Sequence, residues 1–244
     1  MVRFGKLPAP DLSGAPSFTP ALVGLPEPPG TYSGIQEALS GLGKQPANIP
    51  LLWPMDGNDQ YPDCTIAMIL HAQTIYRARY HALCIGGEGE ALNLWRFLAG
   101  GPDVGLYIYD VLKYCQTHPV TDDRILAFAH VDWKDEDAVR KAILYYGALL
   151  VGFQVTQDTV VQWQEGQIWT PAPPIQEWHA VAITGYTDTE LELLTWGTRQ
   201  YASWDWLTTC ADEAWVVVPP EAYHPPFAPG QSVASLIAQM GELA

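Results

Sequence analysis

The sequence is poor in positive charge. It has 12 Lys and Arg residues against 27 Asp and Glu, a formal net charge of -15. Proteins that bind nucleic-acid phosphates or anionic lipid headgroups present clustered Lys and Arg side chains, and the sequence contains no such cluster. We therefore expect neither a nucleic acid nor a membrane surface as a partner, and we interpret the acidity as favouring solubility.

The sequence also has no long apolar run. Nothing approaches the roughly 18 apolar residues that a membrane-spanning helix needs, and residues 1–8 lack the apolar core of a signal peptide. These absences predict synthesis in the cytoplasm and leave the final place of action open.

Cysteine is scarce and scattered. Its four positions, Cys64, Cys84, Cys115 and Cys210, form no CxxC pair, which argues against a disulfide scaffold or a zinc site and suits a reducing compartment. The motifs GxxxxGK[ST], HExxH and strand-linked GxGxxG are missing too. We expect no cofactor and no metal. With 48% hydrophobic residues and ten Trp, the chain is predicted to be folded and globular.

Three regions follow from composition and periodicity. Residues 1–50 are rich in Pro and Gly and predict an extended arm along the protein or a partner. Residues 51–220 predict one domain, and residues 221–244 a linker and a short amphipathic helix. Apolar periodicity predicts helices over 32–42, 64–83, 91–98, 106–117 and 135–146, then strands over 148–155, 178–186, 191–196 and 214–218. This order indicates an α+β fold, with the helix that begins at Cys64 packed on an antiparallel sheet.

A turn-rich segment, Gly57 to Asp63, ends at Cys64. Asp63 is a candidate N-cap, which places Cys64 in the first helical turn. Free backbone N–H groups and the helix dipole favour a thiolate there, so we expect a lowered thiol pKa. Asn58, six residues earlier, could direct its amide at the sulfur. A thiolate beside an amide donor is half of an acyl-transfer site.

A cysteine nucleophile needs a proton acceptor, and His179 is the leading candidate. It stands before Ala180–Tyr186, at the expected start of a strand, where a side chain is held rigidly. The alternative is a strand histidine that bonds a backbone carbonyl. His71, two turns along the cysteine helix, is too far for a direct bond and is interpreted as a packing or supporting residue.

These residues resemble those of the papain-like cysteine peptidases. That family has a Gln six residues before the Cys, where this sequence has Asn58, and a Gly-His-Ala-Val type motif, here Trp178–Val181. The family's Asn-Ser-Trp-Gly motif corresponds to residues 194–197, so Leu194 takes the place of the family Asn. Residues 50–218 are most similar to a phage and bacterial group with a Gly-Asn-Asp-x-Tyr-Gly-Asp-Cys loop and a His-Ala-Val…Gly-Tyr…Thr-Trp-Gly ending. Pro62 departs from that loop.

The resemblance implies a papain-like fold and a thiol hydrolase. Cys64 would be the nucleophile, His179 the proton carrier and Asn58 an oxyanion donor. Thr195 is the candidate imidazole orienter, because Leu194 cannot bond the ring; strand alternation would turn Thr195 away unless the geometry is irregular. The expected substrate is a peptide or another amide, such as a peptidoglycan cross-bridge in a phage setting.

Two other readings stay open. The fold could serve as a catalytically reduced or inactive structural or binding module, for instance a virion component that contacts a protein partner or forms a homo-oligomer through its arm and tail. A transglutaminase-like acyl transferase would use the same Cys64 and His179 pair.

Overall fold

The computed structural model describes residues 2–18, 25–79, 85–121 and 123–220, together with positions 234 and 238. The tail helix expected within 221–244 and the thiol of Cys84 lie outside the described residues. Among the described helices, none combines the length and apolar character needed to cross a bilayer.

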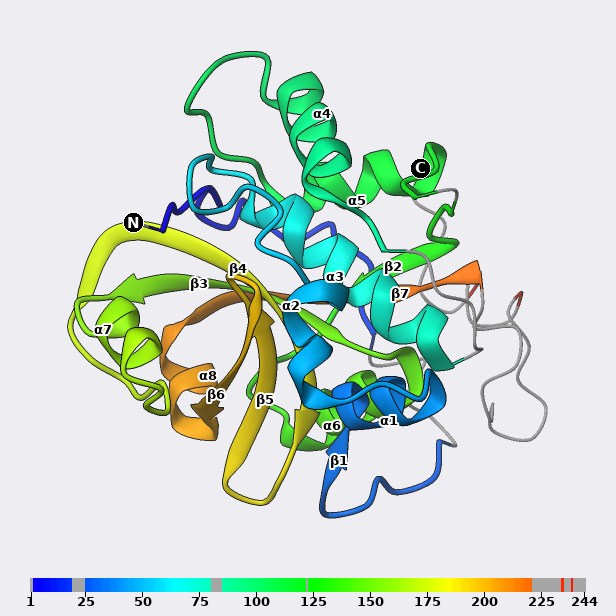
Figure 1. Cartoon of the computed structure of the whole chain (residues 1–244). Helices are drawn as coiled ribbons and strands as arrows, with labels where there is room; N and C mark the ends of the chain where they lie inside the picture. Colours follow the sequence, from blue (N-terminus) through cyan, green and yellow to red (C-terminus); the bar gives the residue numbers. More distant parts are fainter. Residues whose placement is uncertain are drawn as a thin grey trace.

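One antiparallel sheet forms the centre of the molecule (Figure 1). Its strands follow the order β2-β7-β3-β4-β5-β6, and β1 pairs with β4 beside this path. The strand bounds are β1 Tyr32–Ser33, β2 Ala127–His130, β3 Leu149–Thr156, β4 Pro174–Tyr186, β5 Glu190–Thr195, β6 Thr198–Ser203 and β7 Ala211–Val218.

Helices cover the sheet and supply most of the first half of the chain (Figure 1). Their bounds are α1 Gly34–Gly41, the 3-10 helix η2 Pro46–Asn48, α2 Ile49–Leu52, α3 Cys64–Arg79, α4 Glu88–Ala99, α5 Ile108–Thr117, α6 Glu136–Tyr146, α7 Thr159–Gln164 and α8 Trp204–Cys210. Helices first and antiparallel strands afterwards confirm the predicted α+β class.

Both faces of the sheet are buried, which follows from the alternation of side chains along a strand. On β3, Val151 and Phe153 point into a core shared with α6 and α8. Leu150, the residue before Val151, points into a second core shared with α3, α4 and α5. On β4, Ala180 faces this second core, so the start of α3 packs directly on the middle of the sheet.

Helix α3 is buried on all sides, including the side that carries its polar residues. Of its residues Cys64 to Ala78, none is more than 6% exposed. Its polar side chains are bonded internally: Gln73 Nε2 donates to Val120 O at 3.1 Å, and Arg77 pairs with Asp123. A third core of α1, α2, Ile75 and Leu194 closes over its outer side.

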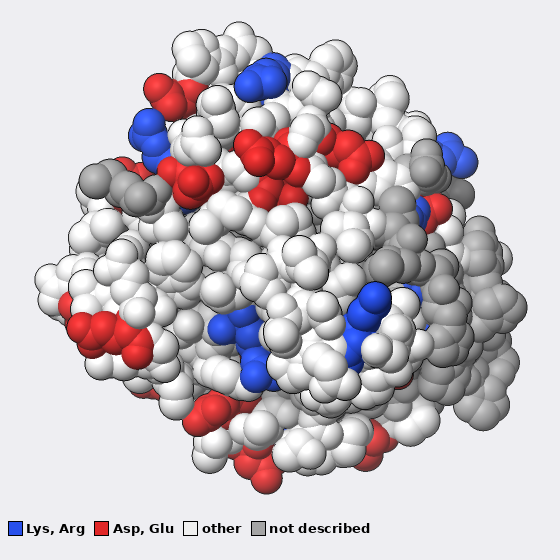
Figure 2. All heavy atoms as spheres, in the orientation of Figure 1, with Lys and Arg blue, Asp and Glu red and all other residues white. Residues whose placement is uncertain are grey.

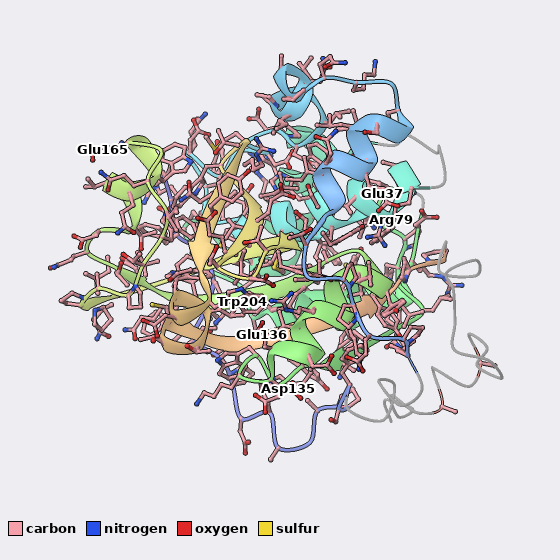
Figure 3. The ribbon with its side chains drawn as sticks, turned by 90° about the horizontal axis from the view of Figure 1, so that it is seen from below. Glu37, Arg79, Asp135, Glu136, Glu165 and Trp204 are labelled. Carbon is pink, nitrogen blue, oxygen red and sulfur yellow. The ribbon has the colours of Figure 1, made fainter. Side chains whose placement is uncertain are left out.

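The last turn of α3 is tied to α1 by charge. Arg79 Nε lies 3.2 Å from Glu37 Oε2, and the two side chains lie close together in Figure 3. On the face drawn in Figure 2, Lys and Arg atoms occupy separate spots among uncharged surface rather than one basic patch.

The sequence predicts the long elements and misses the short ones. Helices α1, α3, α4, α5 and α6 and strands β3, β4, β5 and β7 are confirmed within a few residues, with Gly147 as the C-cap of α6 at φ 95°. Strands β2 and β6 and helices α7 and α8 were not predicted. These four elements are four to seven residues long, which is too short for a clear apolar periodicity. Strand β6 is also mostly polar.

Candidate active site

Cys64 is the first residue of α3, and the loop before it fixes its position. Gly57 has φ 95°, and a Cβ there would meet Leu92 Cδ2 at 2.9 Å, so the turn requires glycine. The backbone N–H groups of Ile66 and Ala67 donate to Asp63 O at 2.8 and 3.1 Å, which starts the helix. The backbone amide of Ala180 on β4 lies near the Cys64 thiol and acts to lower its pKa.

His179 precedes Ala180 on β4, and its ring contacts Phe153 and Trp196 of the first core. It lies within this strand, opposite Phe153, rather than at the predicted strand start, because β4 begins earlier, at Pro174. Trp196 stacks on the imidazole with ring centres 4.6 Å apart. His179 Nε2 is 2.9 Å from Thr195 Oγ1, and Nδ1 has no hydrogen-bond partner among the described residues.

Thr195 contacts the His179 imidazole. The sequence-based prediction that Thr195 orients this ring requires such a contact. Leu194 points the other way, into the core of α1 and α2, so alternation along β5 turns Thr195 toward His179 instead of away from it. The tight turn that follows, with φ 45° at Trp196 and 69° at Gly197, folds Trp196 back over the ring. The Thr195 hydroxyl, and not Leu194, therefore bonds the imidazole.

Asn58 is buried close to the start of α3, but its amide does not point to the sulfur. Its Nδ2 donates to Asp63 Oδ1 at 3.2 Å and to Tyr61 O at 3.3 Å. The Asp63 carboxylate thus accepts the Asn58 amide rather than acting as the predicted side-chain N-cap. Burial raises the pKa of Asp63 to about 7. An oxyanion role for Asn58 stays a prediction that requires its amide to rotate.

The N-terminal arm covers Cys64. In Figure 1 the blue start of the chain runs along the junction of the helices and the sheet. The backbone amide of Gly5 lies near the Cys64 thiol and acts on its pKa. Arg3 N donates to Asn58 O at 2.9 Å, and Leu106 N donates to Gly5 O at 2.8 Å. Phe4 meets the His179 ring edge-on at 5.8 Å. As a result, Cys64 and His179 are each only 1% exposed.

Burial under the arm determines the protonation states of Cys64 and His179. Burial raises the pKa of Cys64 to about 12, against smaller opposing effects from the backbone N–H groups of Ala180 and Gly5. Burial lowers the pKa of His179 to about 3. The predicted lowering of the thiol pKa is therefore wrong for the arm-covered state: loss of hydration outweighs the helix dipole. Both groups are neutral here.

His71 of α3 contacts the segment that precedes the Cys64 loop. Its Nε2 lies 2.9 Å from Pro54 O and 3.2 Å from Asp56 Oδ2, which agrees with a supporting position and not a direct bond to Cys64. Among the described residues, no group of three or more His, Cys, Asp or Glu side chains is placed to hold a metal ion.

Several residues at this site were missed by the sequence analysis. Phe4, Gly5 and Lys6 of the arm contact it, and Trp196 stacks on His179. The Pro-rich arm gave a hint of an extended strap, but nothing in its sequence indicates which surface it covers.

Comparison with known proteins places the fold. No protein-family profile matches the sequence, and no curated protein sequence matches it. Among solved structures, xylellain, a cysteine protease from Xylella fastidiosa, has a TM-score of 0.65 at 15% identity, covering 89% of this chain and 96% of its own. Procathepsin B S9 from Trypanosoma congolense has a TM-score of 0.59 at 13% identity, covering 89% and 86%. The chain has the papain-like cysteine protease fold.

Proposed function

We propose that the protein is a papain-like thiol hydrolase that cleaves a peptide or another amide bond. The observation that carries the proposal is that two consecutive residues of the arm reach the two candidate groups: Phe4 contacts the His179 ring, and the Gly5 backbone amide acts on the Cys64 thiol. The hydroxyl of Thr195 bonds Nε2 of the imidazole, and Nδ1, which has no hydrogen-bond partner among the described residues, is free to accept a proton.

The reaction follows from these roles. His179 Nδ1 takes the thiol proton while Cys64 Sγ attacks the carbonyl carbon of the amide. Collapse of the tetrahedral intermediate breaks the C–N bond, and the imidazolium returns the proton to the leaving nitrogen. Water, deprotonated by the same imidazole, then attacks the thioester, and the acid product and the Cys64 thiol are released.

Stabilisation of the oxyanion uses the start of α3. The backbone N–H of Cys64 lies at a helix N-terminus, where free donors and the dipole favour negative charge. Asn58 would join it once its amide turns from Asp63 and Tyr61, a movement within one loop.

The arm-covered form is a latent form of this enzyme. Residues 3–7 occupy the junction by backbone hydrogen bonds to both sides, and the neutral thiol and imidazole hold no reactive thiolate. Turnover requires the arm to leave, which would rehydrate the pair. The substrate would then be a peptide or, in a phage or bacterial setting suggested by the Gly57–Cys64 loop, a peptidoglycan cross-bridge. Contact of the arm or tail with a protein partner or with a second copy, as in a virion, would instead belong to the alternative function as a binding module.

The rival function is a binding module without catalysis. The burial of Cys64 and His179 and the internal bonds of the Asn58 amide favour it, because such a site need never open. The two functions differ in what happens when the arm is displaced.

Displacement can be tested in the full chain. A Cβ at Gly5 would lie 2.0 Å from the carbonyl oxygen of Pro62, so Gly5→Val should force the arm out of the junction. We expect Gly5→Val to hydrolyse a fluorogenic peptide mixture and the double variant with Cys64→Ala to be inactive. Equal turnover in both, or none in a folded Gly5→Val chain, would refute the hydrolase.

A further inference from the structure

The side chain of Lys6 lies in a closed acidic pocket next to the nucleophile. Its Nζ is 2.8 Å from Glu213 Oε1 and 2.9 Å from Asp212 Oδ2, and it donates to Leu7 O at 2.8 Å. The Lys6 and Glu213 side chains are fully buried, whereas Asp212 is 24% exposed at the mouth. A lysine is rarely buried in this way unless it is paired.

The pocket exists because three neighbouring strands carry small or acidic residues in one row. Ala180 of β4 pairs with Gly152 of β3, and Gly152 pairs with Glu213 of β7. A Cβ on Gly152 would lie 1.9 Å from Lys6 Cε and 2.9 Å from Glu213 Cγ. Any larger residue at 152 would therefore fill the space that the lysine side chain now takes.

The end of the pocket is built for a cation. Glu213 Oε2 accepts a hydrogen bond from Trp215 Nε1 at 2.7 Å, which fixes the carboxylate and turns Oε1 toward Lys6. Burial raises the pKa of Glu213, and the charge of Lys6 opposes that rise. A buried carboxylate that loses its cation is strongly destabilised, so departure of the arm leaves a pocket that favours another cationic side chain.

The pocket is also at the right place for substrate recognition. The backbone amide of Gly5, the residue before Lys6, and the charge of Lys6 itself both act on the Cys64 thiol, and Lys6 N donates to Trp178 O at 3.4 Å. A chain lying in this junction thus puts one side chain into the pocket while its adjoining backbone is at the sulfur.

We propose that this pocket is the specificity subsite of the enzyme, and that it selects peptides with a Lys or Arg side chain close to the bond that is cleaved. Lys6 of the arm occupies it in place of that substrate side chain. Gly152 provides the depth, Glu213 the charge at the end, and Asp212 a second carboxylate at the mouth. The proposal rests on the proposed hydrolase function.

The first test measures cleavage in the Gly5→Val chain, whose arm is displaced by a clash that does not involve the pocket charges. Fluorogenic peptides with each amino acid placed in turn at every position before the leaving group should show a preference for Lys or Arg at one position. Glu213→Gln keeps an acceptor for Trp215 and should remove this preference by on the order of 30-fold or more, with little change for a neutral peptide. Gly152→Ala should act similarly by filling the pocket. Turnover without a basic preference, or a preference that survives both changes, would overturn the proposal.

The second test does not need turnover. A synthetic peptide with the sequence of residues 2–10 should bind the Gly5→Val, Cys64→Ala chain, and a peptide with norleucine in place of Lys6 should bind on the order of 30-fold more weakly. The difference should vanish in Glu213→Gln. If no peptide is ever cleaved, the hydrolase fails while this binding difference still supports a cation pocket. Equal binding of the two peptides would refute the pocket.

Discussion

Charge reversal at Lys6 should uncover Cys64. In Lys6→Glu, a carboxylate would face Asp212 and Glu213, two carboxylates that now hold an ammonium group at 2.9 and 2.8 Å. Like charges at such distances repel strongly in a buried site, so the arm should leave the junction. The Cys64 thiol would then regain water and its ordinary pKa of 9.0 in place of about 12.

The size of the effect follows from the thiolate fraction. At pH 8 a thiol with pKa 12 is about one part in 10⁴ thiolate, and one with pKa 9 is about one part in 10. Alkylation proceeds through the thiolate, so iodoacetamide should label Cys64 up to about 10³ times faster in Lys6→Glu than in the natural sequence. Peptide mass spectrometry would assign the label to its cysteine.

Two controls separate uncovering from unfolding. Lys134→Glu makes the same charge change at an exposed residue and should leave the labelling rate as it is. Cys115, fully buried on α5, should stay unlabelled in every variant, because only unfolding exposes it. A folded Lys6→Glu chain that is labelled at Cys64 no faster than Lys134→Glu would refute the argument that the arm sets the thiol pKa.

Three further outcomes are expected. Thr195→Val keeps the side-chain shape but removes the bond to His179, a loss of about 1 kcal/mol, so kcat in the Gly5→Val background should fall about fivefold or more with little change in KM. The pKa of Asp63 is raised from 3.8 to about 7 in the folded chain, so the fold favours the protonated carboxyl. The contribution of Asp63 to the free energy of unfolding is therefore complete below about pH 4 and is lost as the pH rises through 7. Denaturant titrations should therefore show that Asp63→Asn removes a slope in stability worth up to about 4 kcal/mol between these limits, whereas the exposed Asp205→Asn does not. Ile75→Ala, at a fully buried position of α3, should lower the free energy of unfolding by about 2–5 kcal/mol, and a loss below 1 kcal/mol would contradict its place in the core.

The long helices and strands were predictable from patterns among residues that are close in the sequence. Asp135 to Gly147 shows helical periodicity, a capping carboxylate and a terminal glycine within one short stretch, and Asp135 Oδ1 indeed accepts from Asp137 N at 3.1 Å. Local patterns cannot predict that α3 is buried on all sides. Periodicity reports one apolar face, but the burial of Gln73 and Arg77 depends on acceptors some 46 residues away.

Around the candidate site, sequence and structure contribute different things. The turn-rich loop before Cys64 and the apolar strand after His179 were visible in the sequence, because turn chemistry and strand patterning act between neighbours. The bond from Thr195 to His179 depends on which face of β5 meets the ring. Strand alternation predicts that Thr195 points away from His179, whereas in the structure it points toward it.

The sequence by itself determined the α+β class, the helix that begins at Cys64 and the strand that carries His179, since each is written in residues adjacent along the chain. Only the tertiary structure decided that the arm lies on the sulfur, that burial keeps Cys64 and His179 neutral, and that Lys6 meets Glu213 across more than two hundred positions. The physical reason is that hydration and charge pairing depend on which distant segments meet, and those meetings are fixed by packing of the whole chain.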